Sequence, residues 1–110
     1  MYIYNNQNFI NLNMKKVALL VRLVAKEGKE QQVADFITNA LPLAIAEVDT
    51  TTWYAMQIDK STFGIFDTFP HEEGRQAHLS GEIAKALMAN AAELLSVAPI
   101  IEQVTVLAAK

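Results

Sequence analysis

Apolar and polar positions change their spacing several times along the chain, and each change marks a new predicted element. The sequence KVALLVRLVA at 16–25 is apolar on both faces of a strand, which predicts a central strand covered on both sides. Over 30–48 the apolar residues recur every three to four positions without a missed step, which predicts a helix. Pro42 keeps this phase but removes a hydrogen bond, so we expect a kink or break at Leu41-Pro42 and a second short helical piece.

The second half of the chain predicts a hairpin, two helices and a final strand. Strand formers are frequent before and after the turn Lys60-Ser61, and Pro70 ends the second of these runs. A short polar helix then reaches about Gly81. The longer predicted elements are strands at 51–59 and 62–69, a helix at 82–96 and a strand at 100–109.

The resulting order, β-α-β-β-α-α-β, predicts an α+β ferredoxin-like sandwich with helices on one face of a four-stranded antiparallel sheet. Helices on one face leave the other face of the apolar first strand uncovered. We therefore expect a second copy to cover it, giving a homodimer with a closed, barrel-like interior. Residues 14–110 form the predicted domain, and the Asn-rich residues 1–13 are expected to be a flexible leader, the alternative being an added edge strand through Tyr2 to Tyr4.

Composition supports self-association and excludes several classes of function. Hydrophobic residues make up 52% of the 110 residues and charged residues 19%, which is more apolar than an average domain. The net charge of −3 provides no basic field for nucleic acid or anionic lipid. With no cysteine, disulfides, thiol catalysis and thiolate metal sites are excluded. No apolar run approaches the ~20 residues of a membrane span and no secretory signal opens the chain, so we expect a cytoplasmic protein.

The candidate chemistry lies in FGIFDTFPHEEGRQAHLSG, residues 63–81, which holds both histidines and places Asp67 inside an apolar strand. A buried carboxylate is costly unless it is paired or used. His78 is either a general base or hydrogen-bond donor to substrate, or a tether between helix and strand. Asp67 either orients His78 or binds a substrate hydroxyl, or forms a structural pair with Arg22 or Arg75. We expect His71, at the helix start, to be a surface or capping residue.

Two adjacent aromatic residues, Trp53 and Tyr54, point to opposite faces of their predicted strand. One is expected in the helix-side cleft and the other on the dimer-side surface. An aromatic lining with one hydroxyl suits a flat phenol or quinol, and the alternative is ordinary core and interface packing. The two histidines, seven positions apart, do not form a helical metal pair, and 4 glycines provide no phosphate loop, so no metal or cofactor is expected.

Several of these motifs resemble the antibiotic biosynthesis monooxygenase-like family of dimeric α+β barrels. The similar segments are VALLVRLVAKEGKE at 17–30, the strand that ends at Asp59, FGIFDTFP at 63–70 and QAHLS at 76–80. In that family a strand with an aromatic-acid-x-Trp pattern precedes a helix with Ala-His-Leu. Here Asp67 stands where Glu is usual, Phe69 stands where Trp is usual, and His78 matches the histidine.

The resemblance implies a cofactor-independent monooxygenase, an oxidoreductase acting on a small aromatic or quinol-type substrate in a cleft between helices and sheet. His78 would be the base, oriented by Asp67. Some relatives degrade haem, and in these a histidine on the helix after the Ala-His-Leu segment binds the iron. The corresponding predicted helix at 82–96 contains no histidine, so haem chemistry is not expected. The alternatives are a non-catalytic dimeric ligand-binding or stress-associated domain, or a small isomerase or lyase. The implied substrate contacts are Trp53, Tyr54, Phe69 and Arg22.

Overall fold

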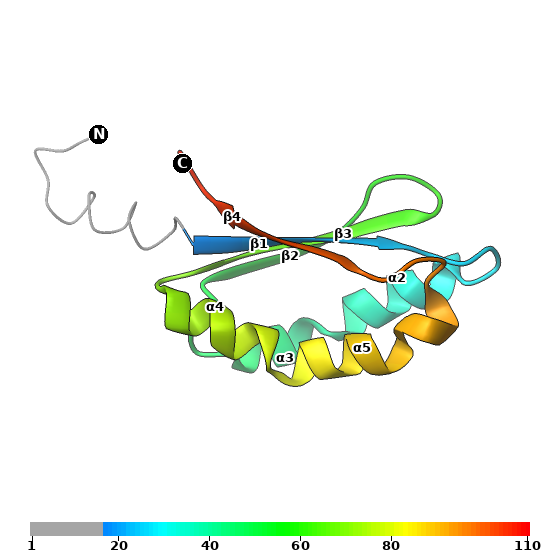
Figure 1. Cartoon of the computed structure of the whole chain (residues 1–110), viewed down its shortest axis with the longest axis horizontal. Coiled ribbons are helices and arrows are strands. Elements are labelled where there is room, and N and C mark those ends of the chain that lie inside the picture. Colours follow the sequence, from blue (N-terminus) through cyan, green and yellow to red (C-terminus); the bar gives the residue numbers. More distant parts are fainter. Residues whose placement is uncertain (1–16) are drawn as a thin grey trace, which may run out of the picture.

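Four antiparallel strands form one sheet, and the helices lie against one of its faces (Figure 1). This computed structural model describes residues 17–110, so the predicted leader at 1–13 lies outside the described residues. The strand order is β2-β3-β1-β4, which is the order of a ferredoxin-like sheet and confirms the predicted α+β fold. The strands are β1 (Val17–Val24), β2 (Thr52–Gln57), β3 (Thr62–Phe69) and β4 (Ile100–Thr105).

The helices confirm the predicted order, with small differences at their ends. The first predicted helix is broken at Ala40, one residue before the expected position. Pro42 lies in the first turn of the second piece, where its missing N–H has no intrahelical partner to lose. The last helix and the last strand both end earlier than predicted. The helices are α2 (Glu30–Asn39), α3 (Leu41–Ala46), α4 (Glu72–Leu79) and α5 (Glu82–Leu94).

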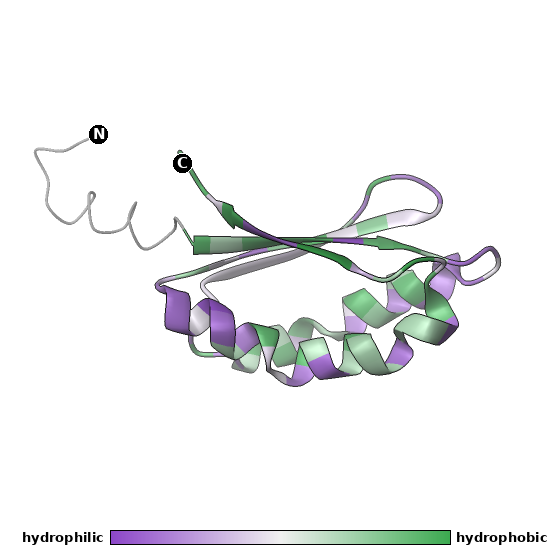
Figure 2. Cartoon of the chain, in the orientation of Figure 1, coloured by the Kyte–Doolittle hydropathy of each residue, from purple (hydrophilic) through white to green (hydrophobic). Residues whose placement is uncertain are grey.

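The main core lies between β1, β3 and the helices. Directly opposed residues of antiparallel strands share a face, and Leu23 lies opposite Phe63 just as Val21 lies opposite Ile65. All four are buried in one cluster with side chains from α2 and α5. Figure 2 shows β1 as mainly hydrophobic along its length and α4 as mainly hydrophilic, so α4 is the most polar of the helices.

The other face of the sheet is largely apolar. Among residues 17–110 the helices lie on one side only, and this second side, here called the open face, is free of them (Figure 1). Tyr54 and Ile100 are 57% and 46% exposed there. Two charged residues, Arg22 and Glu102, are also exposed on this face. The strand register assigns these apolar side chains to it: Leu20, Val24, Tyr54, Met56, Phe66, Ile100 and Val104.

Candidate functional site

His78 is brought into the interior by the short helix α4. The helix is capped at its start by His71, whose Nδ1 accepts a hydrogen bond from the Gly74 backbone N–H at 3.0 Å, which confirms the predicted capping role of His71. Acidic Glu72 and Glu73 occupy the first turn, where the helix dipole favours them. His78 lies in the last turn, and only 8% of its surface is exposed.

The first partner of His78 is Asp67 on β3. Asp67 has no exposed surface, and its Oδ2 lies 3.0 Å from Nε2 of His78. Phe69, two residues further along the same face of the strand, is also fully buried, and its ring centroid lies 5.3 Å from that of His78. The structure therefore brings together the aspartate and the histidine that the sequence singled out.

Neither arginine takes the place of His78 beside Asp67. Arg75 pairs with Glu72 and donates a hydrogen bond to the backbone carbonyl of Ala18 at 3.0 Å. Arg22 lies on the open face, whereas Asp67 points to the helix side of the sheet. The alternative of an arginine–aspartate pair is therefore wrong, and the cation that faces this buried carboxylate is the imidazolium of His78.

The second partner of His78 is Glu47, which the sequence analysis did not identify. Glu47 follows the last residue of α3, and its Oε1 lies 2.6 Å from Nδ1 of His78. The Thr50 hydroxyl donates a hydrogen bond to the same oxygen, also at 2.6 Å. The imidazole thus lies between two carboxylates, one from β3 and one from the loop after α3. The Glu47 side chain is 22% exposed, so it connects the buried pair to the surface.

These surroundings set the protonation state of His78. Burial alone disfavours the imidazolium, but the Asp67 and Glu47 carboxylates outweigh it and raise the pKa of His78 from its ordinary 6.5 to about 8. Burial raises the pKa of Asp67, and the contact with His78 opposes that shift. At neutral pH His78 is therefore mainly a cation held between two acids.

The buried carboxylate of Asp67 and the buried indole N–H of Trp53 lack hydrogen bonds within the described part of the chain. The atoms concerned are both carboxylate oxygens of Asp67 and Nε1 of Trp53. The 3.0 Å contact between Asp67 and His78 is therefore an ion pair whose angle does not meet hydrogen-bond geometry. Trp53 lies opposite Asp67 in the strand register, so a buried donor and a buried acceptor are neighbours on adjacent strands.

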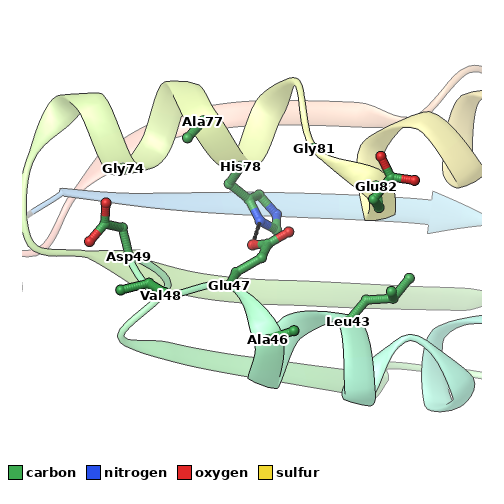
Figure 3. Close-up of a pocket in the computed structure, with 10 residues that line it drawn as sticks. All are labelled: Leu43, Ala46, Glu47, Val48, Asp49, Gly74, Ala77, His78, Gly81 and Glu82. Atoms are coloured by element: carbon green, nitrogen blue, oxygen red, sulfur yellow. Dashed lines mark hydrogen bonds and ion pairs between the residues drawn. The ribbon is translucent and has the colours of Figure 1, made fainter.

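A pocket of about 390 Å³ opens beside His78. It lies between α3 with its following loop on one side and α4 with the start of α5 on the other, and Glu47 and His78 stand in its middle (Figure 3). The prediction placed the cleft between helices and sheet, whereas this pocket lies between helical segments and reaches the sheet only through the His78–Asp67 contact. Its lining residues are Leu43, Ala46, Glu47, Val48, Asp49, Gly74, Ala77, His78, Gly81 and Glu82.

Two glycines allow the walls of the pocket to approach each other. A Cβ at Gly74 would lie 3.0 Å from Cβ and 3.1 Å from the backbone oxygen of Asp49. A Cβ at Gly81 would lie 3.2 Å from Oε2 of Glu47. A side chain at Gly74 would push the loop after α3 away from α4, whereas one at Gly81 would displace the carboxylate end of the Glu47 side chain.

The other residues expected to contact substrate lie outside the pocket lining. Trp53 packs on the helix side against Ala40, Ala44 and Ile83, whereas Tyr54 is on the open face, so the prediction that they face opposite ways is confirmed. Arg22 is also on the open face. Phe69 lies behind His78 rather than in the pocket wall.

The described residues show neither a metal centre nor a membrane helix. No group of three or more histidine, aspartate or glutamate side chains within 17–110 is arranged to hold a metal ion. Over the same residues, every helix is too short or too polar to cross a membrane.

Comparison with solved structures finds a relative of high sequence identity. No protein-family model matches the chain, and no curated protein matches it. The fold is that of a ferredoxin-like α+β protein, and solved structures of this class match over most of the chain. The NE2512 protein of unknown function from Nitrosomonas europaea is 61% identical, with a TM-score of 0.86, over 89% of this chain and 95% of that one. The chain belongs to the same family as this Nitrosomonas protein.

More distant structures share the fold at low identity. A second protein from Nitrosomonas europaea, named "putative antibiotic biosynthesis monooxygenase", is 13% identical with a TM-score of 0.75, over 84% of this chain and 91% of that one. A protein of the same name from Caulobacter crescentus is 13% identical with a TM-score of 0.72, over 92% and 99%. At this identity the likeness shows a common fold alone.

Proposed function

We propose that this protein is a cofactor-independent monooxygenase that acts on a small aromatic substrate of the quinol or anthrone type. The observation that carries the proposal is the His78 imidazole held between Asp67 and Glu47 at the wall of a pocket of about 390 Å³. That volume suits a small organic molecule. The fold shared with proteins named as monooxygenases supports the same reaction class at a coarse level.

Glu47 is the group that takes the substrate proton in this proposal. Both nitrogens of His78 contact carboxylates, so the imidazole has no free nitrogen to present to a ligand. Glu47 lines the pocket and is partly exposed. Two carboxylates and one imidazolium carry one net negative charge, so the cluster becomes neutral when it accepts one proton. His78 keeps the charge beside the new substrate anion, and Asp67 holds His78 in place.

The oxidation balances without an external reductant. With an anthrone, the base removes a proton from the activated CH₂ group, and the resulting carbanion gives one electron to dioxygen. The substrate radical and superoxide combine through a new C–O bond, and the peroxide receives the proton back from Glu47. Loss of the second C–H proton and cleavage of the O–O bond then yield a carbonyl and water, so CH₂ and O₂ become C=O and H₂O. The substrate supplies all four electrons.

We also propose that a second copy of the chain covers the open face. Its central row contains Leu20, Tyr54 and Phe66, and an apolar sheet surface of this kind is stabilised by burial. Arg22 and Glu102 are exposed on the same face, so a two-fold axis can bring opposite charges of two copies together. The partner then closes the sheet from the side opposite the pocket.

Oxygen uptake by metal-stripped protein with a panel of anthrones and quinols tests the proposed reaction. We expect uptake with wild type, and a loss of about a hundredfold or more in Glu47→Gln, because general-base catalysis contributes about that much. Uptake should also fall in His78→Ala, because that variant lacks the cation that lies beside the substrate anion. Glu27→Gln is the matched control, since it removes an exposed carboxylate from the turn after β1. Uptake no higher than the blank, or equal uptake by Glu47→Gln and wild type, contradicts the proposal. Ligands that raise the melting temperature without being consumed would favour the non-catalytic alternative.

A further inference from the structure

The charge of the pocket wall is strongly one-sided. Of the ten lining residues, Glu47, Asp49 and Glu82 are acidic, and His78 is the only one that can carry a positive charge. No lysine or arginine is among them. Asp67 adds a further carboxylate directly behind His78. A bound molecule therefore meets more negative than positive charge.

The carboxylates are spread along the pocket rather than gathered at one point. Figure 3 shows Asp49 beside Gly74 at one end, Glu47 with His78 in the middle, and Glu82 at the other end. Glu47 is already held by His78 and Thr50, and Glu82 lies 3.5 Å from Lys85 in an exposed ion pair. Asp49 takes part in no ion pair within residues 17–110, so its charge is the least compensated of the three.

The remaining wall is apolar. Leu43, Ala46, Val48 and Ala77 line the space between the acidic groups. Apolar side chains favour an organic body, while carboxylates attract an ammonium group and repel a carboxylate. Together they favour an organic molecule that carries an amine.

We propose that the pocket selects its aromatic ligand by charge, binding an amine-bearing aromatic better than a neutral one and a carboxylate-bearing one least. The aromatic body of the ligand rests on the proposed function, and the charge preference rests on Asp49, Glu47 and Glu82. Attraction to exposed charges is modest, so each carboxylate contributes roughly a twofold to fivefold change in affinity. The preference weakens in salt, because about 0.5 M salt screens exposed charges beyond a few ångströms.

Three phenols of similar size test this: tyramine, para-ethylphenol and para-hydroxyphenylacetate. Binding to the full chain is measured by NMR shift perturbation at neutral pH without oxygen, so that turnover plays no part. We expect the affinity to fall from tyramine to para-ethylphenol to para-hydroxyphenylacetate, and the ratio of the first affinity to the last to decrease in high salt. Asp49→Asn and Glu82→Gln should each decrease this ratio at low salt by roughly twofold to fivefold. The matched control Glu27→Gln should leave the affinity ratio unchanged.

Equal affinity for the three phenols, a preference for the carboxylate, or no binding of any of them overturns the inference. Its failure can be told apart from that of the proposed reaction. Selective binding of tyramine without oxygen uptake on any substrate leaves the charge preference standing and removes the monooxygenase. Oxygen uptake with a neutral anthrone, together with equal binding of tyramine and para-hydroxyphenylacetate, leaves the monooxygenase standing and removes the charge preference.

Discussion

His78 Nε2 lies 3.0 Å from Oδ2 of Asp67, and Asp67 has no exposed surface. A carboxylate taken fully out of water is costly unless a cation lies beside it. The imidazolium supplies that cation, and Glu47 on the other ring nitrogen favours the charged form. The charge state of each of the three side chains therefore depends on the other two. Substituting them one at a time measures this dependence.

His78→Gln should destabilise the protein strongly. It leaves the Asp67 carboxylate buried without a cation, and breaking a buried pair from one side costs about 3–5 kcal/mol of unfolding free energy. The double variant Asp67→Asn/His78→Gln removes both charges and should be more stable than His78→Gln alone. Urea unfolding at neutral pH measures both. A loss below about 1 kcal/mol in His78→Gln, the range of exposed pairs, would show that the two groups are not coupled.

Stability should fall as pH rises through the titration of His78. The folded-state pKa of about 8 lies above the ordinary 6.5, so the stabilisation is fully present below pH 6.5 and is lost as the pH passes 8. The shift corresponds to about 2 kcal/mol. Urea unfolding across this range should show the decline in wild type and a smaller one in Glu47→Gln. A flat profile in wild type would contradict the raised pKa.

The hydrophobic spacing of the sequence was enough to predict the fold. The spacing of apolar residues differs clearly between the strands and the helices. The apolar first strand lies inside the sheet, between β3 and β4, as expected. The element ends were less predictable. The apolar stripe over 30–48 suggested one continuous buried face, yet Ile45 and Val48 are exposed. The helix breaks at Ala40, α3 buries only Ala44, and Val48 lies beyond the end of α3.

The site was predictable where its residues carry a local signal. Asp67 stands out as an acid in an apolar strand, and His78 as one of two histidines in the same stretch. Glu47 gives no such signal, since an acid near a helix end is ordinary and its partner lies 31 residues away. Tyr54 and Arg22 were grouped with the site by residue type, but strand alternation places them on the open face.

Gly81→Ala should displace Glu47 from His78. The added Cβ would lie 3.2 Å from Oε2 of Glu47 and from the backbone oxygen of Ala77, which is too close without a local shift. We expect a lower pKa of His78 and weaker ligand binding. Gly64→Ala is a matched control, because its Cβ would meet the flexible Met56 side chain 3.3 Å away on the open face. If crystal structures of Gly81→Ala and wild type show the same Glu47–His78 contact, this prediction is wrong.

Tyr54→Arg should separate the proposed dimer into monomers. Tyr54 lies on the edge strand β2, in the same row of the open face as Phe66 and Leu20, and is 57% exposed, so the change places a charge on the apolar surface of the proposed interface. Sedimentation velocity at micromolar concentration should detect the halved mass. Met88→Arg is the control, since Met88 is an exposed apolar residue of α5 on the helix side. A wild type that sediments as a monomer would contradict the proposal.

The most direct measurement of the coupled Glu47–His78–Asp67 cluster is an NMR titration of the His78 ring in wild type, Asp67→Asn and Glu47→Gln. The geometry predicts a pKa of about 8 in wild type, because both ring nitrogens contact carboxylates. Each variant removes one of the charges that favour the imidazolium, so each should titrate at a lower pH than wild type. The same pKa in all three proteins, close to the ordinary 6.5, would contradict the cluster on which the proposed chemistry rests.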